Sequence, residues 1–222
     1  MGHRAGGVLF HLRPDALDAR RAATRDATLA RLGSYRTAYG KLSQGQVDGL
    51  NSLLAALEDA AAVTDLRAAA YMLATVKHEC ADTWQPVVER GPRSYFNKYD
   101  AGTALGKRLG NTQPGDGYRF RGRGYVQITG RTNYDRLGSA LGMDHPLMQN
   151  PELTLDPAVA YRIMSHGMRK GGFTGKKLSD YINETGCDYF NARRIINGLD
   201  QAARIQSYAG ALEGVLRASV QT

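Results

Sequence analysis

The chain has few cysteines and no long apolar run, and each absence excludes a class of protein. Only Cys80 and Cys187 are present among its 222 residues. Two cysteines are too few for a disulfide scaffold and lack the paired spacing of a zinc site, so we expect both thiols to be reduced and buried. Charged residues interrupt every apolar run well before the ~20 residues that a transmembrane helix needs. These absences leave a globular protein without a metal or disulfide framework.

The N-terminus also lacks the apolar core of a secretory signal. Val8-Leu9-Phe10 is followed at once by His11, Arg13 and Pro14, which breaks the 7 to 15 apolar residues that such a signal requires. We therefore expect a protein that stays in the cytoplasm until another route releases it. Its hydrophobic content of 42% is enough to fill the core of one domain.

Positive charge is in excess, and half of the excess lies near the N-terminus. The formal net charge is +8 and the isoelectric point is about 9.6, which predicts attraction to polyanions such as nucleic acid, anionic lipid or acidic wall polymers. Residues 1–40 contain seven arginines and three aspartates as their charged residues. We interpret this segment as a basic N-terminal arm, loosely docked or solvated, with a weakly amphipathic helix over residues 15–32. Residues 41–222 then form the functional domain.

Helix signals are frequent after residue 41. Ser43 to Gln46 has the pattern of a capping box, and a second helix with an apolar stripe begins near Asp65, which places Glu79 in its last turn. Asp156-Pro157 is typical of another helix start. We also predict a short helix over residues 177–184, and loops with short strands over residues 81–130.

Two glutamates ten residues apart are the candidate catalytic groups. Glu79 follows an apolar helix face, and such surroundings disfavour a charged carboxylate, which suits a general acid. Glu89 lies in a loop beside Arg90 and Arg93, which favour an ionised carboxylate and so suit a general base. Hydrolysis of a glycosidic bond needs one carboxyl group in each role. A pair of surface salt-bridge partners is the alternative.

The segment from Tyr125 to Thr129 predicts a strand beside these glutamates. Alternation places Val126 and Ile128 on one face, towards the core. Tyr125, Gln127 and Thr129 share the other face, which can line a cleft.

These motifs together resemble glycoside hydrolase family 19. The matching segments occur in the family's order between about residues 43 and 217, and they are His78-Glu79, Glu89-Arg90-Gly91, Gly122 to Thr129, Asn150 to Leu153, Ile195 to Gly198 and Arg204 to Tyr208. The family contains plant-type chitinases and the peptidoglycan-cleaving endolysins of phages and bacteria. The resemblance implies a mainly α, two-lobed, lysozyme-like fold in which a short region of strands and loops lines the cleft.

The resemblance also implies a role for individual residues. Glu79 would be the general acid and Glu89 the general base of an inverting hydrolysis, and Thr129 would help Glu89 to hold the attacking water. Neither a metal nor a cofactor is expected. The residues expected to bind substrate or support the carboxylates are His78, Tyr125, Gln127, Asn133, Asn197 and Arg204.

Departures from the family pattern favour the endolysin branch. Cys80 stands where the family usually has threonine, and the interval between the glutamates is shorter than in plant chitinases. We therefore expect a monomeric endolysin that cleaves β-1,4 bonds of bacterial peptidoglycan, with the basic arm contacting anionic wall polymers or membrane. A chitinase acting on N-acetylglucosamine polymers and a catalytically silent sugar-binding module are the alternatives.

Two other functions are less compatible with the sequence. His78-Glu79 could open a zinc-protease helix, but Asp82 stands where that motif requires its second histidine. Residues 119–125 interleave arginines with aromatics, as in proteins that bind single-stranded nucleic acid. Because an apolar strand continues this segment, we expect no specific nucleic-acid partner.

Overall fold

The structure is a computed structural model, and it describes residues 33–59 and 62–220. The helix predicted over residues 15–32 lies outside the described residues, as does most of the predicted basic arm. None of the described helices is both long enough and apolar enough to cross a membrane. The described chain is mainly helical, as the sequence predicts.

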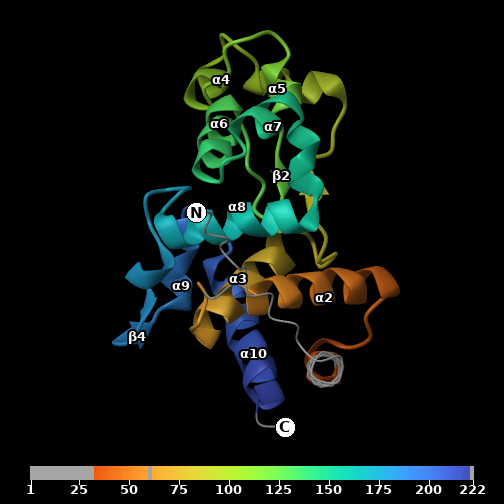
Figure 1. The fold of residues 1–222 in the computed structure, drawn as a ribbon, viewed down its shortest axis with the longest axis vertical. Helices are drawn as coiled ribbons and strands as arrows, with labels where there is room; N and C mark the ends of the chain where they lie inside the picture. The colour runs from red at the N-terminus through yellow and green to blue at the C-terminus, as the bar shows by residue number, and fades with distance from the viewer. Residues whose placement is uncertain (1–32, 60–61, 221–222) are drawn as a thin grey trace, which may run out of the picture.

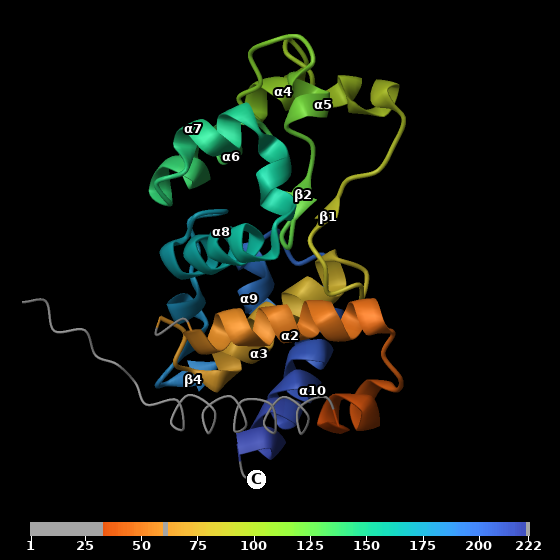
Figure 2. The same cartoon turned by 45° about the vertical axis from the view of Figure 1, so that its right-hand side comes forward.

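The helices form two lobes, with β1 and β2 running between them (Figures 1 and 2). The larger lobe contains α2 (Gln44–Asp59), α3 (Leu66–Glu79), α8 (Pro157–Lys170), α9 (Tyr189–Ala192) and α10 (Ala202–Val220). The smaller lobe contains the 3-10 helix η1 (Arg93–Tyr99), α4 (Ala104–Arg108), α5 (Asp116–Arg119), α6 (Arg131–Ala140) and α7 (Asp144–Gln149). The short 3-10 helix η2 (Pro151–Leu155) leads from the smaller lobe back to α8.

Helix α3 lies at the centre of the larger lobe. It packs along α10, and it is buried on all its faces from Ala70 to Lys77 rather than along one stripe. Asp65 begins the helix, because its side chain accepts a hydrogen bond from the backbone N–H of Arg67. The consequence for the site is that Glu79 projects from the end of a rigid, enclosed element.

Capping residues determine where other helices of the larger lobe begin and end, as the sequence predicts. The Ser43–Gln46 capping box forms, with the side-chain oxygen of Gln46 accepting from the backbone N–H of Ser43. Asp156 accepts hydrogen bonds from two N–H groups in the first turn of α8, and Gly171 ends that helix with a φ of 73°.

Three expectations from the sequence are wrong. Two of them are the strand predicted over residues 125–129 and the burial predicted for Cys187. The predicted strand from Tyr125 to Thr129 is a tight turn, because β2 (Arg123–Gly124) ends where Gly124 adopts a φ of 86°, and the chain returns so that Ile128 pairs with Arg123. Cys187 is exposed, and only Cys80 is a buried thiol.

The helix predicted over residues 177–184 is the third wrong expectation. Only the 3-10 turn η3 (Leu178–Asp180) forms there, followed by the antiparallel hairpin of β3 (Ile182–Asn183) and β4 (Gly186–Cys187). Asn183 stabilises the turn of that hairpin, because its side-chain oxygen accepts hydrogen bonds from the backbone and the hydroxyl of Thr185.

The described end of the predicted arm packs on the larger lobe. Residues 33–39 are helical, Tyr35 is 3% exposed, and Tyr39 packs against the same core. The boundary at residue 40 stays a prediction, but these contacts favour a domain that already includes residue 33.

Candidate active site

Glu79 is the last residue of α3, and its carboxylate forms an ion pair with Arg193. Nη1 of Arg193 lies 2.5 Å from Oε1 of Glu79, whose side chain is 18% exposed. The sequence predicts apolar surroundings for Glu79, and the structure places a guanidinium there instead. A charge-assisted hydrogen bond of this kind holds a carboxyl group in one orientation.

Arg193 is not among the site residues that the sequence predicts. It lies in the 3-10 helix η4 (Arg193–Ile195), is 3% exposed, and donates from Nε to the backbone carbonyl of Asp200 at 3.0 Å. The guanidinium is therefore fixed at both edges. The one available signal was its position two residues before Ile195, where a segment that resembles the family begins.

Glu89 directly follows β1 (Val87–Val88). Its backbone N–H donates to the carbonyl of Gly122 at 2.8 Å, which extends the pairing of β1 with β2. Oε2 accepts from the N–H of Gly122 at 3.2 Å, and Oε1 accepts from the hydroxyl of Tyr99 at 3.1 Å. Burial, and then the Glu89 carboxylate, raise the pKa of the Tyr99 hydroxyl, so that it stays protonated and donates.

Three predicted site residues converge on the space in front of Gly122. A Cβ atom at Gly122 would lie 2.9 Å from Oε1 of Gln127, 3.2 Å from Oε2 of Glu89 and 3.3 Å from Oγ1 of Thr129. Three side-chain oxygens gathered this closely beside Gly122 can share one water molecule, which needs two to four polar partners. Glycine at position 122 allows this close approach, because a Cβ atom there would crowd Oε1 of Gln127.

The turn that carries Gln127 and Thr129 is held rigidly. The amide nitrogen of Gln127 donates to the carbonyls of Val87 and Gly124, at 2.9 and 3.1 Å, and so ties the turn to β1. Asn133, at the start of α6, donates to the carbonyl of Thr129 at 2.7 Å. Asn133 thus holds this turn in place, and its contact with substrate stays a prediction.

Tyr125 does not line the cleft. It is 1% exposed within the core, and burial raises the pKa of its hydroxyl. The sharp turn directs the ring inward, whereas an extended strand would have placed it beside Gln127 and Thr129. Its predicted contact with substrate is therefore not supported by its position.

The turn around Gly124 connects the surroundings of both glutamates. The thiol of Cys80, the residue after Glu79, lies 3.9 Å from the carbonyl oxygen of Gly124 and 3.7 Å from that of Tyr125. The next residues of the same turn surround Glu89. One short hairpin thus contacts the end of α3 on one side and the Glu89 carboxylate on the other.

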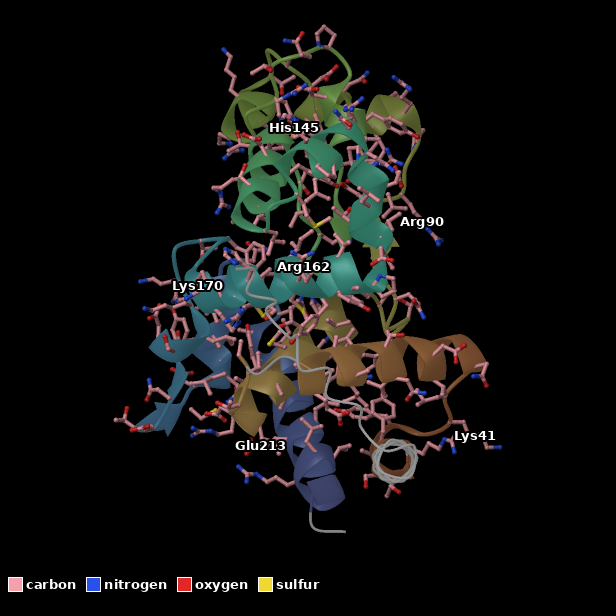
Figure 3. The ribbon with its side chains drawn as sticks, viewed as in Figure 1. Lys41, Arg90, His145, Arg162, Lys170 and Glu213 are labelled. Carbon is pink, nitrogen blue, oxygen red and sulfur yellow. The ribbon has the colours of Figure 1, made fainter. Side chains whose placement is uncertain are left out.

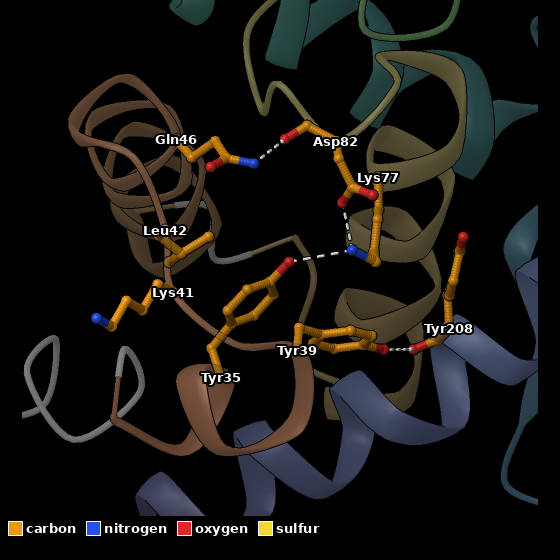
Figure 4. Close-up of a pocket in the computed structure, with 8 residues that line it drawn as sticks. All are labelled: Tyr35, Tyr39, Lys41, Leu42, Gln46, Lys77, Asp82 and Tyr208. Carbon is orange, nitrogen blue, oxygen red and sulfur yellow. Dashed lines mark hydrogen bonds and ion pairs between the residues drawn. The ribbon is translucent and has the colours of Figure 1, made fainter.

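A buried lysine clamps the chain between the two glutamates (Figure 4). Lys77 is 5% exposed, forms an ion pair with Asp82 and donates to the hydroxyl of Tyr35 at 3.1 Å. Its ammonium also lies 4.2 Å from the ring centroid of Tyr39 and 5.1 Å from that of Tyr208. These residues line a pocket of about 300 Å³.

The clamp holds a turn with unusual backbone geometry. Ala81, Asp82 and Trp84 have φ values of 48°, 63° and 60°, which non-glycine residues adopt rarely and at a cost of about 1 kcal/mol or more each. Since this turn leads from Glu79 towards β1, its shape sets the position of β1 and therefore that of Glu89. The Lys77 contacts stabilise that shape.

The remaining predicted residues lie at the edges of this arrangement. His78 is half-buried beside Glu79, whereas Asn197 and Arg204 are exposed. Ile196, the neighbour of Asn197, lines a pocket of about 160 Å³ together with Gln127, Thr129 and Asn133. Asn197 is therefore close to the Thr129 side of the site, while no contact joins Arg204 to the other predicted residues in the part of the chain that the structure describes.

No metal site is evident within residues 33–59 and 62–220, where no three histidine, cysteine, aspartate or glutamate side chains gather in a metal-binding geometry. The predicted site residues described above supply two carboxylates, a hydroxyl and an amide.

Known proteins with similar sequences are chitinases or family 19 proteins. An acidic endochitinase of Solanum chilense is 36% identical over 63 residues, and a glycosyl hydrolase family 19 domain-containing protein of Haemophilus influenzae is 38% identical over 78 residues. These segments cover 28% and 33% of this chain, and 25% and 36% of the relatives. The matches thus span about a quarter to a third of the relatives' length, and no family model matches the chain.

Similar solved structures cover nearly the whole chain. Chitinase C from Streptomyces griseus superposes with a TM-score of 0.54 at 22% identity, covering 85% of this chain and 91% of its own. A bacterial family 19 chitinase superposes with the same TM-score at 21% identity and covers 85% of this chain and 93% of its own. This likeness establishes the fold, which is the lysozyme-like one that the motifs predict. The sequence matches show similarity to chitinases and to a family 19 protein over part of the chain.

Proposed function

We propose that this protein is a glycoside hydrolase that cleaves β-1,4 bonds between N-acetylated amino sugars, with bacterial peptidoglycan as its substrate. The observation that carries the proposal is the convergence of side-chain oxygens of Glu89, Gln127 and Thr129 beside Gly122. This group of oxygens is suited to hold an attacking water. The opposite carboxyl group, Glu79, is held separately at the end of α3.

Glu79 is the general acid in this mechanism. Arg193 binds Oε1, so Oε2 is the oxygen that carries the proton to the leaving glycosidic oxygen. Arg193 orients this carboxyl group without contacting the bond that breaks. General acid catalysis of this kind contributes roughly 10²- to 10⁴-fold to the rate.

Glu89 is the general base. Each carboxylate oxygen already accepts one hydrogen bond, Oε1 from Tyr99 and Oε2 from the N–H of Gly122. Oε2 is the oxygen that lies beside Gln127 and Thr129, so its second lone pair takes the proton from the water. Thr129 and Gln127 supply the remaining contacts that orient the water for attack. Because a water must fit between the sugar and the base, the reaction inverts the anomeric centre.

Peptidoglycan is the first candidate substrate, and chitin is the second. The short interval between the glutamates and the net charge of +8 favour an anionic wall polymer. The names of the relatives favour chitin, since the Solanum protein is an endochitinase. An enzyme that acts on peptidoglycan from the cytoplasm reaches it after a separate pore opens the membrane, and the basic arm then strengthens its contact with the wall.

Digestion of both polymers tests the proposal. Purified peptidoglycan and chitin are incubated with the protein, and the soluble products are identified by mass spectrometry. New reducing ends in peptidoglycan support the proposed activity, and their sugar shows which bond is cut. Binding to both polymers without any product would instead identify a silent sugar-binding module.

A further inference from the structure

Cations and tyrosines surround Glu89 on the smaller lobe. We name this group the cation–tyrosine array, and its members are Arg90, Arg93, Tyr95, Lys98, Tyr118 and Arg121. Arg90 directly follows Glu89 and projects outward from the loop after β1 (Figure 3). Most members are exposed, and Tyr95 is one of three large exposed hydrophobic residues in the described chain, at 44%.

The charges of the array are ordered by ring contacts. The ammonium of Lys98 lies 3.5 Å from the ring centroid of Tyr95. The guanidinium groups of Arg93 and Arg121 lie 4.8 and 4.0 Å from the centroid of Tyr118. Cation–ring contacts at these distances hold a long side chain in place without neutralising its charge.

The acidic residues near the array form ion pairs or hydrogen bonds with other groups. Asp116 pairs with Arg131, and Asp100 accepts hydrogen bonds from the backbone N–H groups of Gly115 and Gly117. Glu152 lies 2.5 Å from Arg123 and 3.7 Å from Arg121.

Three cations of the array consequently have no carboxylate partner within the described ranges. They are Arg90, Arg93 and Lys98. Positive charge therefore remains available on this surface for an anionic ligand.

The array is continuous with the proposed base. Tyr99, whose hydroxyl donates to Glu89, lies with its ring centroid 4.8 Å from the Lys98 ammonium and 6.4 Å from the ring of Tyr95. On the other side, Arg121 immediately precedes Gly122, whose N–H donates to Glu89. A glycan held at Glu89 thus passes beside these cations.

We propose that the cation–tyrosine array binds carboxylate groups carried by the glycan, and so makes the site specific for an anionic amino-sugar polymer. The inference rests on the proposed function, and it names the substrate class of the same site. Peptidoglycan carries a lactyl ether on alternate sugars, which ends in a carboxylate or in a peptide with carboxylates. Chitin carries neither, so it gains nothing from Arg93 or Lys98. The exposed face of Tyr95 offers an apolar surface for a sugar ring beside them.

The test uses a double variant and a matched control. Arg93→Gln/Lys98→Gln removes two charges from the array, and Lys41→Gln/Lys170→Gln removes two exposed charges that lie well away from Arg90 (Figure 3). Each protein is assayed on three soluble substrates of equal length. They are a neutral oligomer of N-acetylglucosamine, a peptide-free muramyl glycan with lactyl carboxylates, and the same glycan with its peptides.

The expected result is a change in KM with little change in kcat. The array variant should raise KM on the carboxylate-bearing glycans by roughly 3- to 30-fold, with kcat and the neutral substrate changed by less than about 2-fold. The wild-type preference for the charged glycans should also weaken as salt increases. A rise confined to the peptide-bearing glycan assigns the recognised carboxylates to the peptide, and a rise confined to the peptide-free glycan assigns them to the lactyl group. A rise on both shows that the array binds carboxylates of either origin.

Two outcomes would count against these proposals, and they are distinguishable. Equal KM changes in the array and control variants, or a wild-type enzyme equally active on neutral and charged glycans, would overturn the inference while leaving the hydrolase intact. Failure of the wild-type protein to cleave any of the three substrates would overturn the proposed function itself.

Discussion

Arg193 and Glu79 form an ion pair across 114 residues of sequence, with 2.5 Å between Nη1 and Oε1. The pair joins the end of α3 to the segment before α10, and it leaves one carboxyl oxygen of Glu79 free for chemistry. Arg193 is 3% exposed, and its removal takes the charged donor away from both Glu79 and the carbonyl of Asp200.

Arg193→Met should therefore reduce both stability and turnover. We expect a loss of about 1–3 kcal/mol in the free energy of unfolding, measured with urea, since the Asp200 carbonyl and Glu79 lose a charged donor. Arg193→Lys should retain part of the stability but little of the turnover, because an ammonium cannot reproduce the two-sided guanidinium contact. Full activity in a folded Arg193→Met protein would show that Arg193 does not orient the acid.

Glu79→Gln should abolish hydrolysis without unfolding the protein. The amide nearly preserves the shape but cannot donate the proton to the leaving oxygen, so we expect a rate loss on the order of 10²- to 10⁴-fold. Glu184→Gln, an exposed glutamate in the β3–β4 turn, is the control and should keep the wild-type rate. Equal rates for wild-type and Glu79→Gln proteins would refute the role of Glu79.

Truncation before and after Tyr35 should have different results. Deletion of residues 1–32 should leave hydrolysis of soluble fragments unchanged and weaken binding to intact walls, most clearly at low salt. Deletion of residues 1–40 also removes Tyr35 and Tyr39 from Lys77, and should cost about 2–5 kcal/mol of stability. Thermal unfolding of both proteins provides the measurement. An unfolded protein lacking only residues 1–32 would place those residues in the core.

Asp116 should make the smaller lobe sensitive to acid. Burial opposes its ionisation, but Arg131 and the N–H groups of Gln113 and Thr112 outweigh this and hold the pKa of its carboxyl below its usual value. A lowered pKa in the folded state means that the stabilisation is complete above the unfolded pKa, and is lost as the pH falls through the folded value. Urea unfolding between pH 7 and pH 3 should show a smaller decline for Asp116→Asn than for wild type, from a lower starting stability. Parallel curves would contradict the prediction.

The sequence predicts the helices better than the chain between them. Capping residues such as Ser43, Asp65 and Asp156 are local signals, and each begins a helix as expected. The turn at Tyr125 was mistaken for a strand because its composition alternates, while the bend is set by the backbone at Gly124 and by contacts with distant β1.

Prediction of the site from the sequence is limited in the same way. Glu79, Glu89, Gln127 and Thr129 were predicted because they lie in short motifs, and the structure brings Glu89, Gln127 and Thr129 together beside Gly122. Arg193 and Lys77 depend on tertiary contacts with residues far away in sequence, which neither periodicity nor spacing encodes. Tyr125 was assigned to the wrong face for the same reason as the strand.

Thr129→Val separates water positioning from substrate binding. The substitution keeps the shape of the side chain but removes the hydroxyl that faces the space at Gly122. We expect kcat to fall by about 10-fold or more with KM nearly unchanged, because the lost contact is made to the attacking water. Initial-rate kinetics on a soluble glycan provide the measurement, and a change confined to KM would contradict the role of Thr129.

Proton NMR of the first products is the most direct test of the two-carboxylate mechanism. A soluble wall fragment or chito-oligosaccharide is digested in the spectrometer and read before mutarotation equilibrates the anomers. Inversion with Glu79 as acid and Glu89 as base requires the two carboxyl groups to lie roughly 6.5–9.5 Å apart and gives the α anomer first. An initial β anomer would mean a retaining reaction, and would contradict the roles of Glu89 as general base and of Thr129 as its partner in holding the water.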